Sequence, residues 1–138
     1  SVEIYSTALT EAVGMLGARI TPTMRFADIK IENFDAIVFI GGSGASQYWD
    51  DPFAHKLAKD AVAFNKVLGA ICIAPVTLAK AGVLKSKRAT VWSEEADMLK
   101  LSGAVYSGNP VERDGKIITA AGPFAASEFA EALVAALQ

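Results

Sequence analysis

Residues 67–75 read VLGAICIAP, a stretch that joins a strand to a helix across one sharp turn. Val67–Ile73 is a nearly continuous apolar run, which is typical of a buried strand in a parallel sheet. Pro75–Ala81 predicts a helix, because proline is favoured at the first helical position and Gly82 can end the helix. Cys72 is therefore expected at the junction between strand and helix.

A second strand is expected upstream, at Asp35–Ile40 (DAIVFI), buried on both faces of the sheet. It runs directly into a glycine loop, Gly41–Ser46 (GGSGAS). A helix follows, with Asp50 or Asp51 as its cap and Pro52 in its first turn. The residues expected on its apolar face, at helical spacing, are Phe53, Leu57, Ala61 and Phe64.

The rest of the chain continues the alternation of strands and helices. The other expected elements are a short strand at Val2–Ser6, an irregular hairpin or extended arm at Ala12–Ile20, a strand at Ala89–Trp92, a helix capped by Ser93 that stops near Gly103, strands at Val105–Tyr106, a hairpin beside the sheet at Val111–Ala120 with its turn at Asp114-Gly115, and a helix at Phe124–Leu137.

This alternation predicts an α/β fold, namely a flavodoxin-like open, mostly parallel sheet with helices on both faces. The 138 residues fit a single domain, 1–138. In such a fold the ligand crevice lies at the carboxyl ends of the strands. The loops Gly41–Ser46 and Cys72–Pro75 both leave strands at that edge.

The composition argues against several classes of function. Hydrophobic residues make up 52% of the chain, and the net charge of -2 leaves no basic excess for nucleic acid. No apolar run approaches the ~20 residues that span a bilayer. One cysteine cannot form an internal disulfide, which fits a cytoplasmic location. Cys72 and His55, the only residues of their types, cannot by themselves make a four-ligand zinc site, so we predict no metal and no cofactor.

The turn at Cys72 has the form of a nucleophile elbow. A nucleophile at such a turn projects above the sheet, and the following amides point toward developing negative charge. The start of a helix also favours the thiolate. The alternative is a buried structural cysteine, since free cysteine is among the most commonly buried residues. The residues alone leave both interpretations open.

Four strings in order resemble the ThiJ/PfpI superfamily: DAIVFIGGSGA at 35–45, AICIAP at 70–75, LAKAGVLKSKRATVW at 78–92 and VERDGKIITAAGP at 111–123. The superfamily includes intracellular peptidases, glyoxalases, a protein deglycase and chaperones. The resemblance implies that Cys72 is the elbow nucleophile and that the amides of Gly42 and Ile73 are oxyanion-hole donors. It also implies that Gly122 and Pro123 border the pocket.

Three positions depart from the family pattern. Ile73 stands where the peptidase branch has the histidine of its catalytic dyad, and an alkyl side chain cannot transfer protons. Ala74 replaces the usual glycine after it. Trp92 lies near the place where deglycase-like members have a different pocket histidine. The family resemblance therefore supplies a nucleophile without its usual base.

Family members usually open with a strand and helix of roughly thirty residues, a length normal for a βα unit. The turn between these two elements supplies a glutamate that hydrogen-bonds the cysteine. This chain begins at what resembles the second strand. We therefore expect the first strand and helix to precede Ser1, with that strand between Val2–Ser6 and Asp35–Ile40.

Other features receive simpler interpretations. The glycine loop has neither the third glycine of a dinucleotide site nor the Lys-Ser/Thr of a P-loop. His55 is expected at the surface rather than as a base. Tyr48 and Trp49 are expected to pack in the core, although they could line a pocket or an interface. Glu94, Glu95 and Asp97 are expected to complement the dipole at the start of the helix that follows Ser93. The resemblance implies a homodimer or higher homo-oligomer, and an apolar patch in the early arm could support it. This patch consists of Met15, Leu16, Ile20 and Met24.

Three functions follow from these observations. The first is an enzyme that uses Cys72 against a carbonyl of a small-molecule or peptide substrate, as a hydrolase, glyoxalase or deglycase. The second is a non-catalytic stress or redox module in which Cys72 is reversibly oxidised. The third, a flavodoxin-like mononucleotide binder, rests on the glycine loop alone.

Overall fold

Four strands form the central sheet of the computed structural model, which describes residues 1–138. Their order is β5 (Ala36–Phe39), β6 (Val67–Ile71), β10 (Ile117–Ala120) and β9 (Val111–Asp114). The first three strands are parallel, and β9 is antiparallel to β10. The predicted α/β fold with a mostly parallel central sheet is thereby confirmed.

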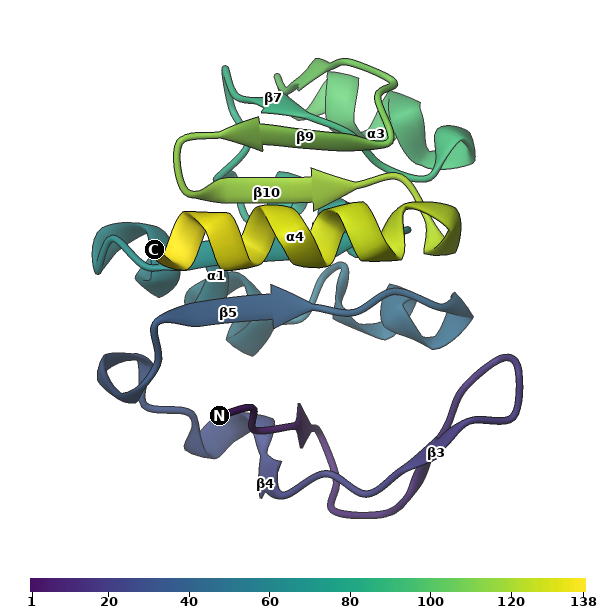
Figure 1. The fold of residues 1–138 in the computed structure, drawn as a ribbon, viewed down its shortest axis with the longest axis vertical. Coiled ribbons are helices and arrows are strands. Elements are labelled where there is room, and N and C mark those ends of the chain that lie inside the picture. The colour runs from purple at the N-terminus through teal and green to yellow at the C-terminus, as the bar shows by residue number, and fades with distance from the viewer.

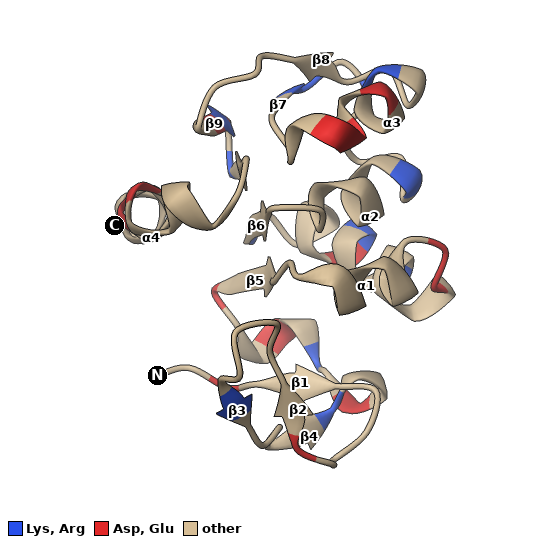
Figure 2. Ribbon diagram, turned by 90° about the vertical axis from the view of Figure 1, so that its right-hand side faces the viewer, with Lys and Arg blue, Asp and Glu red and all other residues tan.

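Helices cover both faces of this sheet (Figure 1, Figure 2). On one face lie α1 (Pro52–Ala63), α2 (Pro75–Lys80) and, farther along, α3 (Ala96–Leu101). On the other face α4 (Ala126–Leu137) lies alone. The larger core fills the first side and includes the fully buried Leu68, Val76, Leu78, Leu84 and Leu99. A smaller core under α4 consists of Val67, Ile71, Ile118, Ala120, Ala125 and Phe129.

Asp51, rather than Asp50, caps α1. Its carboxylate accepts hydrogen bonds from the amides of Phe53 and Ala54, at 2.8 and 3.0 Å. The predicted apolar face of this helix was wrong at both ends, because Phe53 and Phe64 are exposed. A helix turns by 100° per residue, so the face that meets the sheet begins one position later. It consists of Ala54, Leu57, Ala58 and Ala61.

The hairpin expected beside the sheet is part of the sheet itself. Its turn at Asp114-Gly115 forms as predicted, with Gly115 at φ +62°. However, β10 lies between β6 and β9, with Ile118 in register with Gly69. β10 is buried at all four positions, which explains its apolar sequence. The prediction missed this because periodicity does not reveal which strand is the neighbour.

Two short strands lie beyond β9. The strand expected at Ala89–Trp92 is shorter and earlier, β7 (Arg88–Ala89), and it pairs in parallel with β8 (Val105–Tyr106). Ser93 does not cap the next helix through its side chain; it begins a 3-10 turn that leads into α3.

The N-terminal residues form two small sheets separate from the central one. β1 (Tyr5–Ser6) pairs in parallel with β4 (Met24–Arg25). β2 (Ala12–Val13) and β3 (Arg19–Ile20) form an antiparallel hairpin, as expected for the arm. Neither small sheet pairs with β5, so the outer edge of β5 has no strand beside it.

The expectation that Asp35–Ile40 is buried on both faces was wrong. Ile37 and Phe39 are buried on the α1 side, but Val38 and Ile40 are 37% and 69% exposed on the opposite side. The reason is that α4 lies over β6 and β10 and does not extend over β5 (Figure 1).

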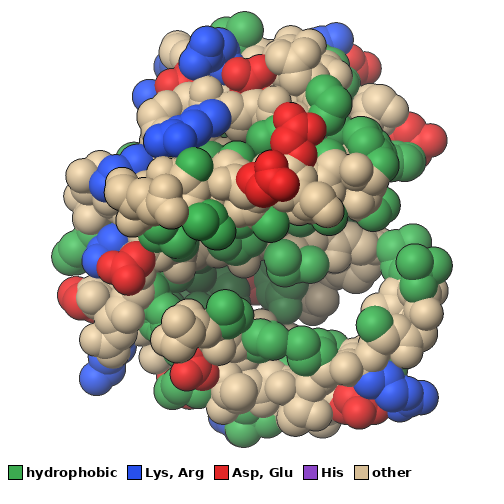
Figure 3. Space-filling model, viewed as in Figure 1, with side chains coloured by type: hydrophobic (Ala, Val, Ile, Leu, Met, Phe, Trp, Pro, Cys, Tyr) green, Lys and Arg blue, Asp and Glu red, His purple; other side chains and the backbone are tan.

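An apolar groove separates β1 from β5. It holds a cavity of ≈ 120 Å³, and Figure 3 shows the surface hollowed beneath the α4 layer, with hydrophobic side chains around the hollow. Desolvation raises the pKa of the Tyr5 hydroxyl there, with smaller contributions from Glu3 and Asp28. The lining residues are Glu3, Tyr5, Phe26, Ile29, Phe34, Ala36, Ile37, Val38, Phe39 and Leu57.

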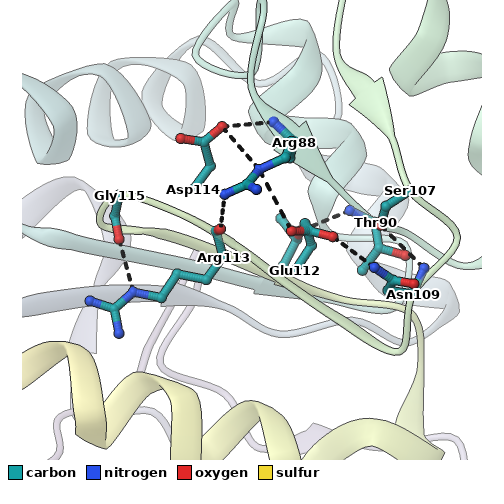
Figure 4. Close-up of polar contacts among 9 residues, drawn as sticks. Arg88, Thr90, Ser107, Asn109, Glu112, Arg113, Asp114 and Gly115 are labelled. Carbon is teal, nitrogen blue, oxygen red and sulfur yellow. Dashed lines mark hydrogen bonds and ion pairs between the residues drawn. The ribbon is translucent and has the colours of Figure 1, made fainter.

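A polar cluster fastens β7 to the outer strand of the central sheet (Figure 4). The Arg88 amide donates to Asp114 at 2.9 Å, and its guanidinium donates to the Arg113 carbonyl at 3.1 Å. Glu112 lies 3.8 Å from the same guanidinium. Two residues on, the Thr90 amide donates to Thr119 Oγ1 at 2.9 Å. These contacts fix the segment that leads to Trp92.

Candidate active site at the Cys72 turn

Cys72 follows directly after β6 and adopts φ +64°, in the left-handed region. Few non-glycine residues adopt this conformation, which costs of order 1–3 kcal/mol and persists only where the surroundings enforce it. Asn65 and Ser86 are the other non-glycine residues with positive φ, and both are exposed loop residues. Cys72 is half-buried at the end of a fully buried strand.

Hydrogen bonds on both sides hold the backbone of this turn. The Cys72 amide donates to the Ala120 carbonyl at 2.9 Å, across from the end of β10. The Trp92 amide donates to the Cys72 carbonyl, also at 2.9 Å. The two peptide groups that flank Cys72 are therefore fixed by distant parts of the chain. This is the kind of enforcement that a strained residue requires.

Gly41 lies in close contact with the cysteine. A Cβ atom added at Gly41 would lie 2.5 Å from Cys72 Cβ and 2.6 Å from the Ile71 carbonyl oxygen. No side chain fits at position 41, because the two backbones approach too closely. Gly42 was predicted as a site residue and Gly41 was not, although the paired glycines were a visible signal in the sequence.

Gly42 and Ile73 are the residues that follow Gly41 and Cys72, the two residues in close contact. Gly42 follows Gly41 at φ +102°, and Ile73 follows Cys72 as a half-buried residue. Neither the Gly42 amide nor the Ile73 amide donates to a protein atom. The next amide along the glycine loop, that of Ser43, instead faces Met15 Sδ at 3.2 Å. These two amides therefore have no hydrogen-bond partner within the protein.

Trp49 and His55 lie behind the turn. The Trp49 indole donates from Nε1 to the Ile73 carbonyl at 3.2 Å, and His55 Nε2 lies 2.7 Å from the Trp49 carbonyl. His55 is partly exposed, in line with the expected surface position, and its ring is bound to backbone. Trp49 packs against the larger core, as expected, but it also contacts the turn through its N–H.

Gly122 is buried, and Pro123 begins the 3-10 turn that leads into α4. A Cβ at Gly122 would lie 3.0 Å from the Trp92 ring, so the Gly-Pro pair packs against the residue whose amide holds Cys72. Trp92 thus occupies the space beside the turn with an indole, which cannot act as a base.

No side chain hydrogen-bonds to Cys72 Sγ. The carboxylates of Glu94, Glu95 and Asp97 lie at the start of α3, where Asp97 pairs with Lys100 at 3.8 Å. No three His, Cys, Asp or Glu side chains gather closely enough to hold a metal ion. No helix combines the length and hydropathy needed to cross a bilayer. The Cys72 thiol therefore has no acid–base side chain bonded to it.

These features define a class: α/β proteins with a cysteine at a strand-to-helix turn beside a glycine loop. The DJ-1/PfpI family model matches residues 1–136, and the chain belongs to that family. An uncharacterized protein from Methanocaldococcus jannaschii is 42% identical over 125 residues, covering 88% of this chain and 61% of that protein. The glutathione-independent glyoxalase DJR-1.2 from Caenorhabditis elegans is 33% identical over 136 residues, covering 98% of this chain and 73% of the glyoxalase.

Solved structures agree with this assignment. The ThiJ/PfpI domain protein from Brachyspira murdochii has a TM-score of 0.95 and 31% identity, over 98% of this chain and 78% of that one. More distant relatives include an isonitrile hydratase from Pseudomonas putida, at 29% identity, and the deglycase PfpI from Pyrococcus furiosus, at 25%. This chain spans 61% to 73% of the length of the first two relatives named above.

Proposed function

We propose that this protein is an enzyme in which Cys72 attacks the carbonyl carbon of a small-molecule or peptide substrate. The observation that carries the proposal is the enforced left-handed turn at Cys72, flanked by the unpaired amides of Gly42 and Ile73. In the first step the thiolate forms a sulfur–carbon bond, and the carbonyl π electrons move to oxygen. The two amides stabilise that oxyanion, since preorganised donors act where charge develops.

Small α-oxoaldehydes and carbonyl adducts suit this site better than peptides. Amide cleavage requires a proton for the leaving nitrogen, and Ile73 stands where the peptidase branch has its histidine. Positioned acid–base groups typically contribute about 100- to 10,000-fold to rate. Addition to an aldehyde needs less help, and the relatives named as a glyoxalase and a deglycase support this substrate class. We therefore expect weak peptidase activity.

The test is consumption of methylglyoxal by the wild type and by Cys72→Ala. We expect slow turnover by the wild type and none by Cys72→Ala. Ser86→Ala is the matched control, because Ser86 also has a positive φ, of 62°, but lies in an exposed loop. Equal consumption by the wild type and Cys72→Ala would contradict an aldehyde-directed role for the cysteine.

A second candidate function is a redox-responsive module. The observation that favours it is the absence of any imidazole or carboxylate bonded to Cys72 Sγ, which leaves the thiol without a catalytic base. A peroxide would oxidise the thiol to sulfenic acid and be reduced to water or an alcohol. Mass spectrometry after peroxide treatment distinguishes the two functions: a single-oxygen adduct on Cys72, removed by thiol reductant, without methylglyoxal turnover, favours the module.

Self-association belongs to the same proposal. The hairpin and its neighbouring strand expose an apolar patch, here called the arm patch, that consists of Met15, Leu16, Ile20 and Met24. Leu16 is 99% exposed. The Sδ atom of Met15 accepts a hydrogen bond from the amide of Ser43 in the glycine loop. Burying such a patch against a second copy would remove apolar surface from water. We propose a homo-oligomer assembled through this patch.

A further inference from the structure

We propose that Trp49 is a positioning residue for the elbow cysteine: its indole N–H holds the first turn after Cys72, and His55 in turn holds Trp49. This inference rests on the proposed role of Cys72 as a reactive thiol. Trp49 lies in the segment between the glycine loop and α1, and His55 lies in α1, so both side chains come from outside the turn itself.

The Ile73 carbonyl is the point of attachment. It accepts the Trp49 indole N–H at 3.2 Å and the Val76 amide, also at 3.2 Å. The second bond belongs to the start of α2, whereas the first comes from a residue far away in the chain. With the Ile73 carbonyl fixed in this way, the peptide group before it has less freedom to rotate. That preceding peptide carries the unpaired Ile73 amide.

The Trp49 bond adds to the bonds that hold the strained Cys72. A left-handed non-glycine residue can relieve its strain by a rotation of the adjacent peptide group, unless the surroundings prevent it. The bonds from Cys72 to Ala120 and from Trp92 to Cys72 fix the turn on the sheet side. On the helix side, the Trp49 indole supplies the corresponding bond from outside the turn.

His55 fixes Trp49. Because a carbonyl oxygen only accepts, the 2.7 Å contact requires His55 Nε2 to carry the proton and donate it to the Trp49 carbonyl. His55 lies in the first turns of α1, whose cap at Asp51 is itself well formed. The helix therefore supports the His55 ring rigidly. Protonation of the other ring nitrogen, Nδ1, would leave the Nε2 donor in place.

A second contact ties the same segment to α2. Lys80, in the last turn of α2, donates to the Asp50 carboxylate at 2.9 Å. This pair is solvent-exposed on the Asp50 side, so it contributes little by itself. It nevertheless places Asp50, the residue after Trp49, next to the C-terminal end of α2. The segment thus contacts Ile73, which precedes α2, through a partly buried bond, and Lys80, in the last turn of α2, through an exposed bond.

The experiment compares Trp49→Phe with Tyr48→Phe. Trp49→Phe keeps an aromatic ring and removes the donor, whereas Tyr48→Phe removes a hydroxyl that makes no hydrogen bond from the adjacent residue. The measurement is the second-order rate of Cys72 alkylation by iodoacetamide across pH, with circular dichroism melting as a fold control. We expect Trp49→Phe to slow alkylation by about three- to tenfold, the size of one lost hydrogen bond. Tyr48→Phe should match the wild type.

The His55 variants test the chain of contacts without altering the indole. His55→Ala removes the donor and should slow alkylation in the same direction, while His55→Gln keeps an N–H donor and should restore the rate. If Trp49→Phe does not fold, the His55 pair decides. Unchanged rates in folded Trp49→Phe, or equal rates in His55→Ala and His55→Gln, would overturn the inference. A wild-type rate no higher than that of the unfolded chain would instead contradict the reactive thiol, and the variant ratios would still test Trp49.

Discussion

Gly41 and Cys72 come from loops after neighbouring parallel strands, and their backbones meet so closely that a methyl group on Gly41 would lie 2.5 Å from Cys72 Cβ. This contact joins the glycine loop to the elbow. It also places the unpaired Gly42 amide next in the chain to a residue that touches the cysteine. The close approach is therefore the structural basis of the proposed oxyanion site.

Gly41→Ala should disturb this contact. The added methyl group overlaps backbone atoms that cannot move independently, so we expect a loss of about 1–3 kcal/mol in the free energy of unfolding. Cys72 alkylation should slow as well. Denaturant unfolding and the alkylation assay provide the measurements. Gly44→Ala is the control, because the nearest atom to its added Cβ is the end of the Gln47 side chain, at 4.0 Å. Equal stability of the two variants would contradict the overlap.

The cap of α1 gives a second prediction. Asp51→Ala removes the acceptor of two amide hydrogen bonds and should lower the free energy of unfolding by about 0.5–2 kcal/mol. Asp50→Ala removes only the exposed contact with Lys80 and should cost between about 0 and 1 kcal/mol. Thermal unfolding of both variants is the measurement. A larger loss of stability for Asp50→Ala than for Asp51→Ala would contradict the assignment of Asp51 as the cap.

The arm patch predicts self-association. Leu16→Asp places a charge where a second copy would bury an apolar side chain, so the variant should shift toward monomer in light scattering coupled to size-exclusion chromatography. Leu101→Asp is the control, since Leu101 is also highly exposed, at 86%, but lies in α3 away from the arm. If the wild type is a monomer, or both variants dissociate equally, the arm patch is not the interface.

The groove between β1 and β5 suggests where further chain would fit. We propose that a strand preceding Ser1 occupies it, parallel to both neighbours, and that a helix covers Val38 and Ile40. The support is the unpaired outer edge of β5, the apolar lining and the exposed face beside α4. Parallel neighbours require a crossover of a dozen or more residues, usually a helix.

Hydrogen exchange measures this. In a polypeptide that carries the preceding residues, the amides at the outer edge of β5 should exchange more slowly than in residues 1–138. The amides of β9, at the opposite edge of the sheet, serve as the internal reference. Identical exchange at β5 in both polypeptides would contradict the proposal. The same comparison shows whether a carboxylate from the added segment slows or speeds Cys72 alkylation.

Local chemistry made much of the fold predictable from the sequence. The buried run before Cys72, Pro75 at the start of α2 and the Asp-Gly turn between β9 and β10 each depend on residues close together in the chain. The same holds for Asp51 and Pro52 at α1, where the sequence left only the choice between two adjacent aspartates. Burial was less predictable: Val38 and Phe53 are apolar, yet their exposure depends on which strands α4 covers and how α1 is rotated.

The sequence by itself determined the order of strands and helices and the position of Cys72 on a strand-to-helix turn, because short-range sterics and hydrophobic periodicity act between near neighbours. The tertiary structure alone decided the insertion of β10 beside β6, the contact of Gly41 with Cys72 and the bond from Trp49 to Ile73. Each of these joins residues that are distant in the chain, and such pairings are selected by the packing of the whole core rather than by any local pattern.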